Sequence, residues 1–554
     1  MPLVSLTSIL DILVLASFLS AIFAIRDYQR RRGLPYPPGP RPLPLIGNLL
    51  DIPKEFSWLS YTQLSKNHGM IYFAEKGLLT EAMTGDVLSF HVFGKVIVVL
   101  NSLKANKDLL ERRGDIYLDR PVIPIFEMMK WEWNLAFSNY TDSCRLARKL
   151  LDRSLRPAII AAYRPLLQTK THALLTQVLA NPDELEAYLH HLSGSLILAM
   201  GYGYEVKGLN DPKVNAAKNM IKLTSTTTLP GALLVNDLPF LRHIPEWLPW
   251  FSYKPLARYG CNIGQEVLQG PMEFVRETIL NGTAQPSLAL DNLQETEKLE
   301  EPERGKMEEM IARALGSTYL AGTDTTATSL MSFFVAALLR PEIQTMAQAE
   351  LDAVTRRERL PTFEDRPRLP FVDAICQEVV RWRPVVPLGM PHATTEDDIY
   401  NGFFIPKGAA VIVNAWAILH DPVMYPEPDT FKPERFIDPN GSLREDPVLT
   451  SSFGFGKRIC PGRHLADATL FIAVASLLSV FDIKKGGNGT GGGPDVYPFT
   501  GGVVRALSPA PSPQGMEGQK SLFSPLHELL GSFVRLVFHV FTKAALFNKE
   551  TRSI

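Results

Sequence analysis

Hydrophobic and polar positions along the chain predict helices and a few short strands. Arg304–Leu339 is a long, mostly apolar run that Arg340-Pro341 ends, which indicates one long helix. Phe371–Trp382 and Arg463–Phe481 favour two shorter helices. Strands are expected in three β-rich segments, at Val87–Phe93, Lys95–Leu100 and Ala410–Asn414.

The amino end carries a separate apolar segment. Leu3–Ile25 is apolar apart from Asp11 and a few hydroxyl side chains, and its length suits a membrane-spanning helix, although an acid is unusual there. Four arginines follow between residues 26 and 32, so the positive-inside rule places the rest of the chain in the cytosol. A cleaved signal peptide is disfavoured because no basic residue precedes the apolar run.

The segment after this run contains a proline cluster, Pro35–Pro40, that is stiff and cannot continue a helix. We therefore expect a transmembrane anchor at residues 1–25, followed by a basic stop and proline hinge at residues 26–40.

Composition excludes some classes of function. The 554 residues are 45% hydrophobic and 21% charged, and a net charge of −1 gives no field that would attract nucleic acid. The four cysteines are far apart and include no Cys-x-x-Cys pair, so neither a zinc site nor a disulfide framework is expected. Reduced thiols fit a domain that faces the cytosol.

The most specific motif runs from Phe453 to Gly462 and reads Phe-Gly-Phe-Gly-Lys-Arg-Ile-Cys-Pro-Gly. Gly456 permits backbone conformations and close approaches that a Cβ would block, and Arg458 can bind a carboxylate. Cys460 lies just before a predicted helix, where free N–H groups favour a thiolate. A thiolate in such a loop suits a haem iron, whereas the alternative is a buried free cysteine beside a turn.

These residues match every fixed position of Phe-x-x-Gly-x-Arg-x-Cys-x-Gly, and the chain therefore resembles the cytochrome P-450 family. The resemblance implies a mainly α fold with a smaller β region, in which haem b lies between the long distal helix and the cysteine-loop helix. Cys460 would be the axial thiolate ligand of the iron. Phe453, Gly456, Arg458 and Gly462 would complete the haem-binding loop, with Arg458 at a propionate.

A polar sequence, Ala321–Thr326, interrupts the long apolar helix. Taken alone it could be a stripe that faces solvent, because Thr and Asp compete with backbone hydrogen bonding inside helices. The resemblance places it on the distal helix of the family. There Ala321 and Gly322 would make room for oxygen, and Asp324 and Thr325 would relay protons.

Glu378 and Arg381 lie three positions apart on the helix predicted at Phe371–Trp382. Such a pair usually lies on the surface and contributes little. Its place between the distal helix and the cysteine loop resembles the Glu-x-x-Arg element of the family, with Arg435 as the third member. The three side chains would then form a buried structural network that holds the cysteine loop.

Two further residues resemble propionate donors of the family. His392 lies where members often have one, although a lone histidine is usually a satisfied polar residue. Arg148 matches the arginine of the Trp-x-x-x-Arg helix, which we expect at Asn139–Leu150, but Cys144 stands where the tryptophan is common. One hydrogen bond to a propionate is therefore expected to be absent.

The resemblance extends over about residues 35–505, and we expect the haem-thiolate catalytic domain at residues 41–505. Met70–Thr84 looks like an insertion, and Tyr497–Val504 resembles the final strands of the family. Residues 506–554 form an atypical tail with a proline-rich linker and a possible amphipathic helix at Leu522–Phe547. The alternative is that this tail is not physiological.

The resemblance implies a haem-thiolate monooxygenase that inserts one oxygen atom from O2 into an apolar small molecule. Electrons would come from an NADPH-cytochrome reductase, because nothing in the chain resembles a flavin or nicotinamide domain. We expect a single-pass protein of the endoplasmic reticulum membrane with a cytosolic catalytic domain. The reductase would dock on a basic face near Lys457, Arg458 and Arg463.

Two alternatives remain open at this point. Cys144, the insertion and the tail motivate a haem-binding sensor or a catalytically impaired family member. A rearranging enzyme that uses peroxides is the other alternative, which the Asp324-Thr325 pair disfavours.

The substrate does not follow from the sequence. The expected pocket lining is mostly apolar, with Trp131 and Trp133 as bulky walls, and consists of Ile123–Phe137, Arg313–Leu320 and Val385–Met390. Lipids, terpenoids and aromatic compounds would all suit it. The chain resembles fungal members of the family, which often act in secondary metabolism.

Overall fold

The structure is a computed structural model, and it describes residues 25–43, 46–53, 55–75, 85–228, 233–247 and 252–484. Several segments with sequence-based predictions lie outside these residues: the anchor up to residue 24, the end of the 70–84 insertion, the family-like segment at 497–504 and the tail at 506–554. The beginning of the insertion continues helix α2 (Ser57–Glu75).

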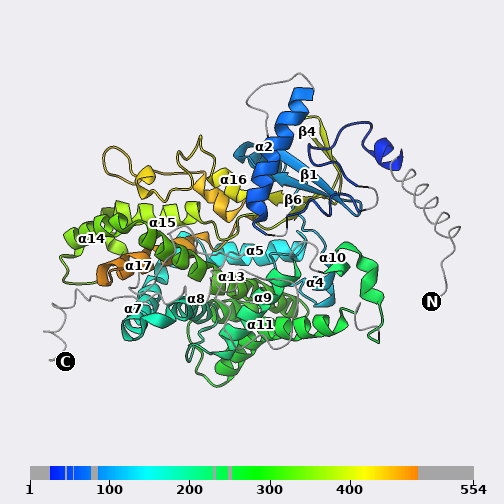
Figure 1. The fold of residues 1–554 in the computed structure, drawn as a ribbon. Coiled ribbons are helices and arrows are strands. Elements are labelled where there is room, and N and C mark those ends of the chain that lie inside the picture. Colours follow the sequence, from blue (N-terminus) through cyan, green and yellow to red (C-terminus); the bar gives the residue numbers. More distant parts are fainter. Residues whose placement is uncertain are drawn as a thin grey trace.

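Helices form most of the described fold (Figure 1). After α2 they are α3 Leu103–Asn106, α4 Pro124–Met128, α5 Asp142–Ser154, α6 Pro157–Ala162, α7 Arg164–Ala180, α8 Leu185–Tyr202, α9 Pro212–Thr227, α10 Leu234–Asp237, α11 Lys254–Leu280, α12 Leu288–Thr296, α13 Glu303–Leu339, α14 Pro341–Thr355, α15 Pro370–Trp382, α16 Ala415–Leu419 and α17 Arg463–Val480. Helix α13 lies at the centre and packs against α5, α8, α9, α11, α12, α15 and α17.

The helices predicted from the pattern are confirmed, with small shifts at their ends. Helix α13 ends at Leu339 and Pro341 begins α14, as the Arg340-Pro341 signal indicates. The helix expected at 139–150 begins later, at Asp142, because Thr141 is its N-cap and accepts a hydrogen bond from the backbone N–H of Cys144.

The strands form one four-stranded sheet, in the order β1-β2-β6-β3, and a separate β4-β5 pair. Their bounds are β1 Val87–Val92, β2 Lys95–Leu100, β3 His392–Ala393, β4 Asp398–Tyr400, β5 Phe403–Ile405 and β6 Ala410–Val413. Phe93 and Gly94 join β1 to β2 with positive φ angles of 47° and 79°, as a two-residue hairpin requires.

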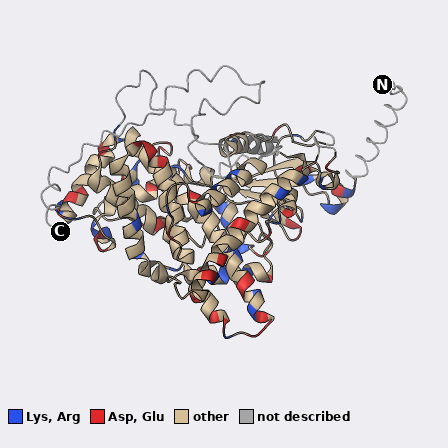
Figure 2. Ribbon diagram, turned by 90° about the horizontal axis from the view of Figure 1, so that it is seen from below, with Lys and Arg blue, Asp and Glu red and all other residues tan. Residues whose placement is uncertain are grey.

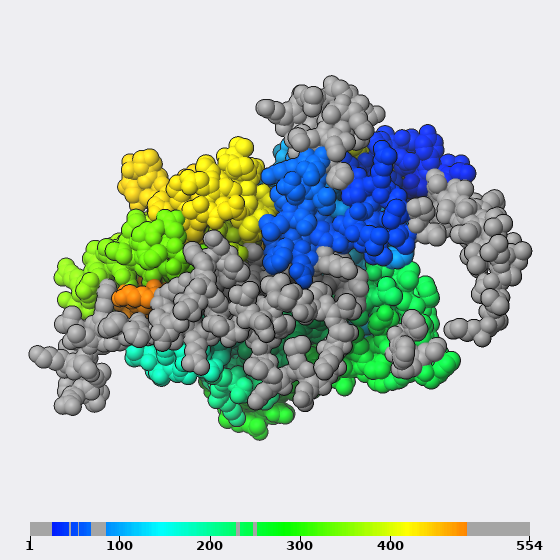
Figure 3. Space-filling model, viewed as in Figure 1, coloured from blue at the N-terminus to red at the C-terminus, as the bar shows by residue number. Residues whose placement is uncertain are grey.

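Parallel pairing of β2 with β6 brings together two parts of the chain that are more than 300 residues apart, Ile97 beside Ala410 and Leu100 beside Val413. In Figure 3 the early segments (blue) and the later ones (yellow) accordingly lie next to each other on one side of the molecule. The three predicted strands are all present in this sheet.

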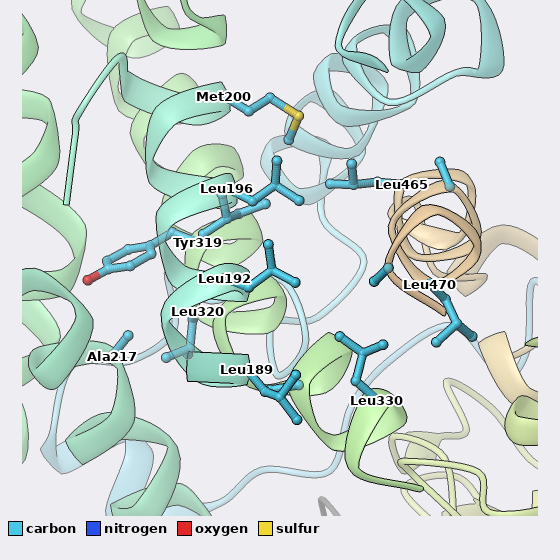
Figure 4. Close-up of a cluster of buried hydrophobic side chains, with 14 of the residues drawn as sticks. Leu189, Leu192, Leu196, Met200, Ala217, Tyr319, Leu320, Leu330, Leu465 and Leu470 are labelled. Carbon is cyan, nitrogen blue, oxygen red and sulfur yellow. The ribbon is translucent and has the colours of Figure 1, made fainter. Parts of the chain in front are cut away.

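The main hydrophobic core lies among the helices, and Figure 4 shows its part between α8, α13 and α17. Leu189, Leu192 and Leu196 are spaced by three and four residues along α8, so they line one face of that helix. They are at most 4% exposed and point toward Leu330 of α13 and Leu470 of α17. This packing fixes α13 relative to the helix that follows the cysteine loop.

Helix α17 is the one helix of the described ranges that is apolar and long enough to cross a membrane, and 67% of it is buried inside the protein. Its contacts with α7, α13, α14 and α15 identify it as a core helix. Basic and acidic residues are interspersed along the ribbon in Figure 2, in keeping with the net charge of −1.

Candidate functional site

The cysteine loop connects a short 3-10 segment, Leu449–Phe453, to α17. The backbone N–H of Cys460 donates a 2.8 Å hydrogen bond to the carbonyl of Phe453, which closes the loop on itself. Gly456 has φ +54°, and a Cβ there would lie 2.3 Å from the carbonyl oxygen of Leu110. This glycine is therefore required both by its backbone conformation and by the close approach of the π-helical turn Lys107–Arg112.

Gly462 differs from Gly456, because a Cβ added to it would meet only the Sγ of Cys460, at 3.8 Å. Its backbone is the N-cap of α17. Among the described residues, no close neighbour would prevent a larger side chain at position 462.

Cys460 lies just before α17 and is partly exposed as a whole residue, whereas its sulfur is buried. Burial raises its pKa, although the backbone N–H groups of Gly462 and Arg463 and the charges of Arg148 and Arg463 act in the opposite direction. The groups at the helix start therefore act in the direction that the sequence predicts, toward the thiolate, and burial of the sulfur opposes them. A bound metal ion would supply the missing stabilisation, because coordination deprotonates a thiol.

Arg148, Arg458 and Arg120 form a buried cationic cluster beside this loop, with side chains no more than 8% exposed. Arg148 donates a 2.6 Å hydrogen bond to the Ile459 carbonyl. Arg458 donates to the carbonyls of Leu118, Leu135 and Ser138 and lies 3.4 Å from the Cys144 sulfur, and Arg120 donates to the carbonyls of Met390 and Pro391.

The partners of these arginines in the described chain are carbonyls and a thiol, not carboxylates. Asp119 acts on Arg458 only through space, since it accepts a hydrogen bond from the Tyr140 backbone. Burial first, and then the charges of Arg458 and Arg148, lower the pKa of Arg120 to about 9. Its Nε has no hydrogen-bond partner within the part of the chain that the structure describes. Buried cations without a compensating carboxylate are costly, so the cluster fits an anionic ligand.

His392 lies at the edge of the same cluster, in β3 beside β6. Its Nδ1 is 2.8 Å from the Tyr117 carbonyl, and burial followed by the charge of Arg120 lowers its pKa well below the usual value. The structure therefore brings three sequence-predicted residues together: Arg148, His392 and Arg458. Sequence reasoning missed Arg120, because a single arginine before a proline carries no motif.

Helix α13 is mostly buried, but its segment from Ala321 to Thr326 is partly exposed and contains small and hydroxyl side chains. Ala321 is exposed between Leu320 and Thr323, which are buried, and the hydroxyl of the partly exposed Thr325 donates a 3.0 Å hydrogen bond to the Ala321 carbonyl. A Cβ on Gly322 would lie 2.9 Å from the side chain of Ile197. Gly322 therefore allows α8 to approach closely, which differs from the expectation that it leaves room for a ligand.

Asp324 is directed toward a different neighbourhood from Thr325. Its Oδ1 lies 3.5 Å from Nδ1 of His190 on α8, and its side chain is 13% exposed. Burial raises the pKa of Asp324 to about 6, while the charge of Lys218 lowers it and that of Glu186 raises it. A carboxyl with this pKa can gain and lose a proton near neutral pH.

Glu378, Arg381 and Arg435 form a network that is almost completely buried. Glu378 accepts two hydrogen bonds from Arg381, at 2.6 and 2.8 Å, and one from Arg435 at 3.2 Å. Its Oε1 also accepts from the Lys432 backbone N–H, and Arg381 donates to the Leu419 and Pro428 carbonyls. The network links α15 to the segment that precedes the cysteine loop.

A cavity of about 260 Å³ lies against α13 and the start of α5. Its lining includes Ile123, Phe126, Trp131, Trp133, Phe137 and Arg313, which come from two of the three predicted segments. Residues of Val385–Met390 do not line it. A second cavity of about 360 Å³ shares Glu132, Trp133 and Arg313 with the first.

Comparison with known proteins agrees with this geometry. The family model described as Cytochrome P450 matches residues 37–490. Cytochrome P450 monooxygenase 208 of Postia placenta is 41% identical over 83% of this chain and 86% of its own length, and cytochrome P450 monooxygenase claR of Ampulloclitocybe clavipes is 38% identical over 84% and 83%.

Cytochrome P450 monooxygenase COX1 of Coprinopsis cinerea is 35% identical over 94% of this chain and 98% of its own length. That coverage exceeds what residues 1–505 alone would supply, so the similarity extends into the tail. The cysteine loop, the distal helix and these similarities together show that the chain belongs to the cytochrome P450 family, as a monooxygenase with fungal relatives.

Proposed function

We propose that this protein is a haem-thiolate monooxygenase that uses haem b to oxygenate an apolar small molecule, and that the Cys460 thiolate would hold the haem iron. The observation that carries the proposal is the buried cluster of Arg120, Arg148 and Arg458 beside the Cys460 loop. Its uncompensated positive charge matches the two carboxylates of a haem, and the thiol supplies a ligand for the iron.

The residues that would hold the haem come from elements that are distant in the sequence. Arg120, Arg148, Arg458 and His392 would bind the propionates, and the loop from Phe453 to Gly462 would lie on the thiolate side. When bound, the haem supplies the activation of dioxygen. The protein contributes orientation, exclusion of water and proton transfer.

On the other side, Thr325 and Ala321 of α13 would face the haem, because Ala321 is exposed within a mostly buried helix. Thr325 would hold a proton at its hydroxyl, and Asp324 would replenish it after a side-chain rotation or through water. Thr325→Ala should leave NADPH oxidation in place but divert it from product to peroxide. An unchanged ratio of product to NADPH in this variant contradicts the relay role.

The substrate would occupy the part of the cavity beside Trp131 and Trp133, because Arg120 and Cys144, which line the same cavity, would face the haem propionates. Phe126, Phe137 and Leu135 supply further apolar contacts there. Arg313 and Glu132 reach the same space, so oxygen-bearing apolar molecules would also fit. A screen of such compounds by the shift of the Soret band tests this placement, with Trp133→Ala as the variant that should lose binding.

The electron donor would be a membrane-bound NADPH-cytochrome reductase, with the protein anchored by residues 1–25 in the endoplasmic reticulum membrane. One expected member of its docking face is excluded: Arg458 is only 6% exposed and cannot meet a partner. Lys457 is exposed but pairs with Asp115, and Arg463 donates to the Cys460 carbonyl. Lys457→Glu should slow reduction at low ionic strength, and the difference should vanish as salt is added.

A catalytically impaired family member is the second candidate, and Cys144 is the observation that favours it. Its sulfur takes the position beside Arg458 where the family motif has an indole. Turnover with reductase and NADPH decides between the candidates. Product formation that follows NADPH use supports the monooxygenase, and a stable thiolate-ligated haem without turnover supports the impaired form.

A further inference from the structure

Asp324 belongs to a cluster of four ionisable side chains that join three helices. His190 and Glu186 come from α8, Lys218 from α9 and Asp324 from α13. The Nδ1 of His190 is 3.5 Å from the Asp324 carboxylate, and this nitrogen is buried with no hydrogen-bond partner among the described residues. The two side chains are 15% and 13% exposed.

Helix geometry accounts for this cluster. Glu186, His190 and Gly194 follow one another at intervals of four residues, so they share a face of α8. A Cβ on Gly194 would lie 3.1 Å from Val214 of α9 and 3.7 Å from Thr323 of α13. The same face therefore meets both helices, and Lys218 lies one turn after Val214.

The charge of Lys218 acts on the pKa of each of the other three groups. Burial, and then the charge of Lys218, lower the pKa of His190 to about 4, whereas the Thr323 backbone acts in the opposite direction. Burial also lowers the pKa of Lys218, while Asp324 and Glu186 raise it. Burial raises the pKa of Glu186, and the charge of Lys218 partly offsets this rise. At neutral pH His190 is thus a neutral ring beside the Asp324 carboxyl.

We propose that His190 is a positioning residue for Asp324, and that Lys218 and Glu186 adjust proton supply by this carboxyl in opposite senses. The inference rests on the proposed relay role of Asp324 and goes further, because it assigns control of that role to residues of α8 and α9. His190 limits the rotation of the carboxyl at its Oδ1. Lys218 favours the ionised carboxylate, and Glu186 favours the protonated form.

The first measurement follows histidine ring resonances by NMR in the reduced, carbon-monoxide-bound holoprotein, with isotope-labelled histidine. The His190 resonance should shift with a midpoint near pH 6, and Asp324→Asn should abolish that shift. Lys218→Met should move the midpoint up and Glu186→Gln should move it down, each by about 0.5–1 pH unit. His191→Gln is the matched control, because the contact with the Asp324 carboxylate is made by His190 and not by the adjacent His191. Midpoints that stay fixed in both charge variants overturn the inference.

The second measurement is the ratio of product to NADPH as a function of pH. Its alkaline limb should move up in Lys218→Met and down in Glu186→Gln, parallel to the NMR midpoints. If the NMR midpoints move but the alkaline limb of the product-to-NADPH ratio does not, Lys218 and Glu186 do not control proton supply. The proposed function fails separately, through loss of the thiolate spectrum or of Thr325-dependent coupling.

The positioning role of His190 is tested by a pair of substitutions. His190→Phe removes the polar atom that faces Asp324 and should lower the ratio of product to NADPH several-fold. His190→Gln keeps such an atom and should restore most of it. The carbon monoxide spectrum verifies that both variants fold. Equal losses in the two variants contradict the role.

Discussion

Two buried charged regions of the protein differ in how their charges are compensated. In the network of Glu378, Arg381 and Arg435, each guanidinium meets a carboxylate within the protein. In the cluster of Arg120, Arg148 and Arg458, the described partners are carbonyls and a thiol. A network that is complete holds the fold, whereas a cluster that lacks its anion indicates the place of a ligand.

The largest effect is expected in the complete network. Glu378→Gln leaves two buried guanidinium groups without their charge partner and should lower the free energy of unfolding by about 3–5 kcal/mol. Glu427→Gln is the control, because Glu427 is 64% exposed and pairs with Lys432 on the surface, where the loss should be about 0–1 kcal/mol. Denaturant unfolding measures both, and equal losses contradict the distinction.

Asp324 is a third case, a buried acid whose compensation is partial. Its pKa is raised from 3.8 to about 6, so the folded protein holds this proton more tightly than the unfolded chain. The ionisation of this carboxyl therefore lowers the stability of the fold progressively as the pH rises from 3.8 to about 6. Below pH 3.8 the carboxyl is protonated in both states and has no such effect. The free energy of unfolding of Asp324→Asn, relative to that of the wild type, should therefore rise by up to about 3 kcal/mol between about pH 4 and pH 6. Parallel stability curves from urea unfolding at a series of pH values contradict this assignment.

Substitutions in the cluster of Arg120, Arg148 and Arg458 should weaken haem binding more than they lower the stability of the fold. Arg120→Met should accelerate haem loss about 10- to 100-fold, measured by transfer to an acceptor protein, because groups in the outer shell of a metal site have effects of this size. Arg113→Met is the matched control, since Arg113 is 41% exposed and pairs with Asp398. Equal haem loss in both variants means that the cluster does not bind the propionates.

The smallest effect concerns Cys144, which lies beside Arg458 and lines the cavity of about 260 Å³. Cys144→Trp would restore an N–H donor where the family motif has one. One hydrogen bond contributes about 1 kcal/mol, so haem loss should slow by a few-fold. Cys261→Trp, on α11, should leave the rate unchanged. A faster loss in Cys144→Trp shows that the indole does not fit.

The sequence predicts those parts of the molecule that local patterns determine. Helices α13, α15 and α17 follow from apolar runs and proline signals. The spacing of Glu378 and Arg381 alone indicates a surface pair, and only the family resemblance predicts their buried network. Arg120 and His190 could not be predicted, because their neighbours are 28 and 134 residues away, at Arg148 and Asp324. Exposure also escapes local reasoning: Arg458, expected at a docking surface, is buried.

The central claim is that Cys460 ligates a haem iron as a thiolate. The reduced, carbon-monoxide-bound protein tests it by the position of the Soret band. The account predicts the strongly red-shifted band of thiolate ligation in the wild type and its loss in Cys460→Ser, with Cys144→Ser as a control that keeps it. A wild-type protein without that band, or a Cys460→Ser variant that retains it, would contradict the account.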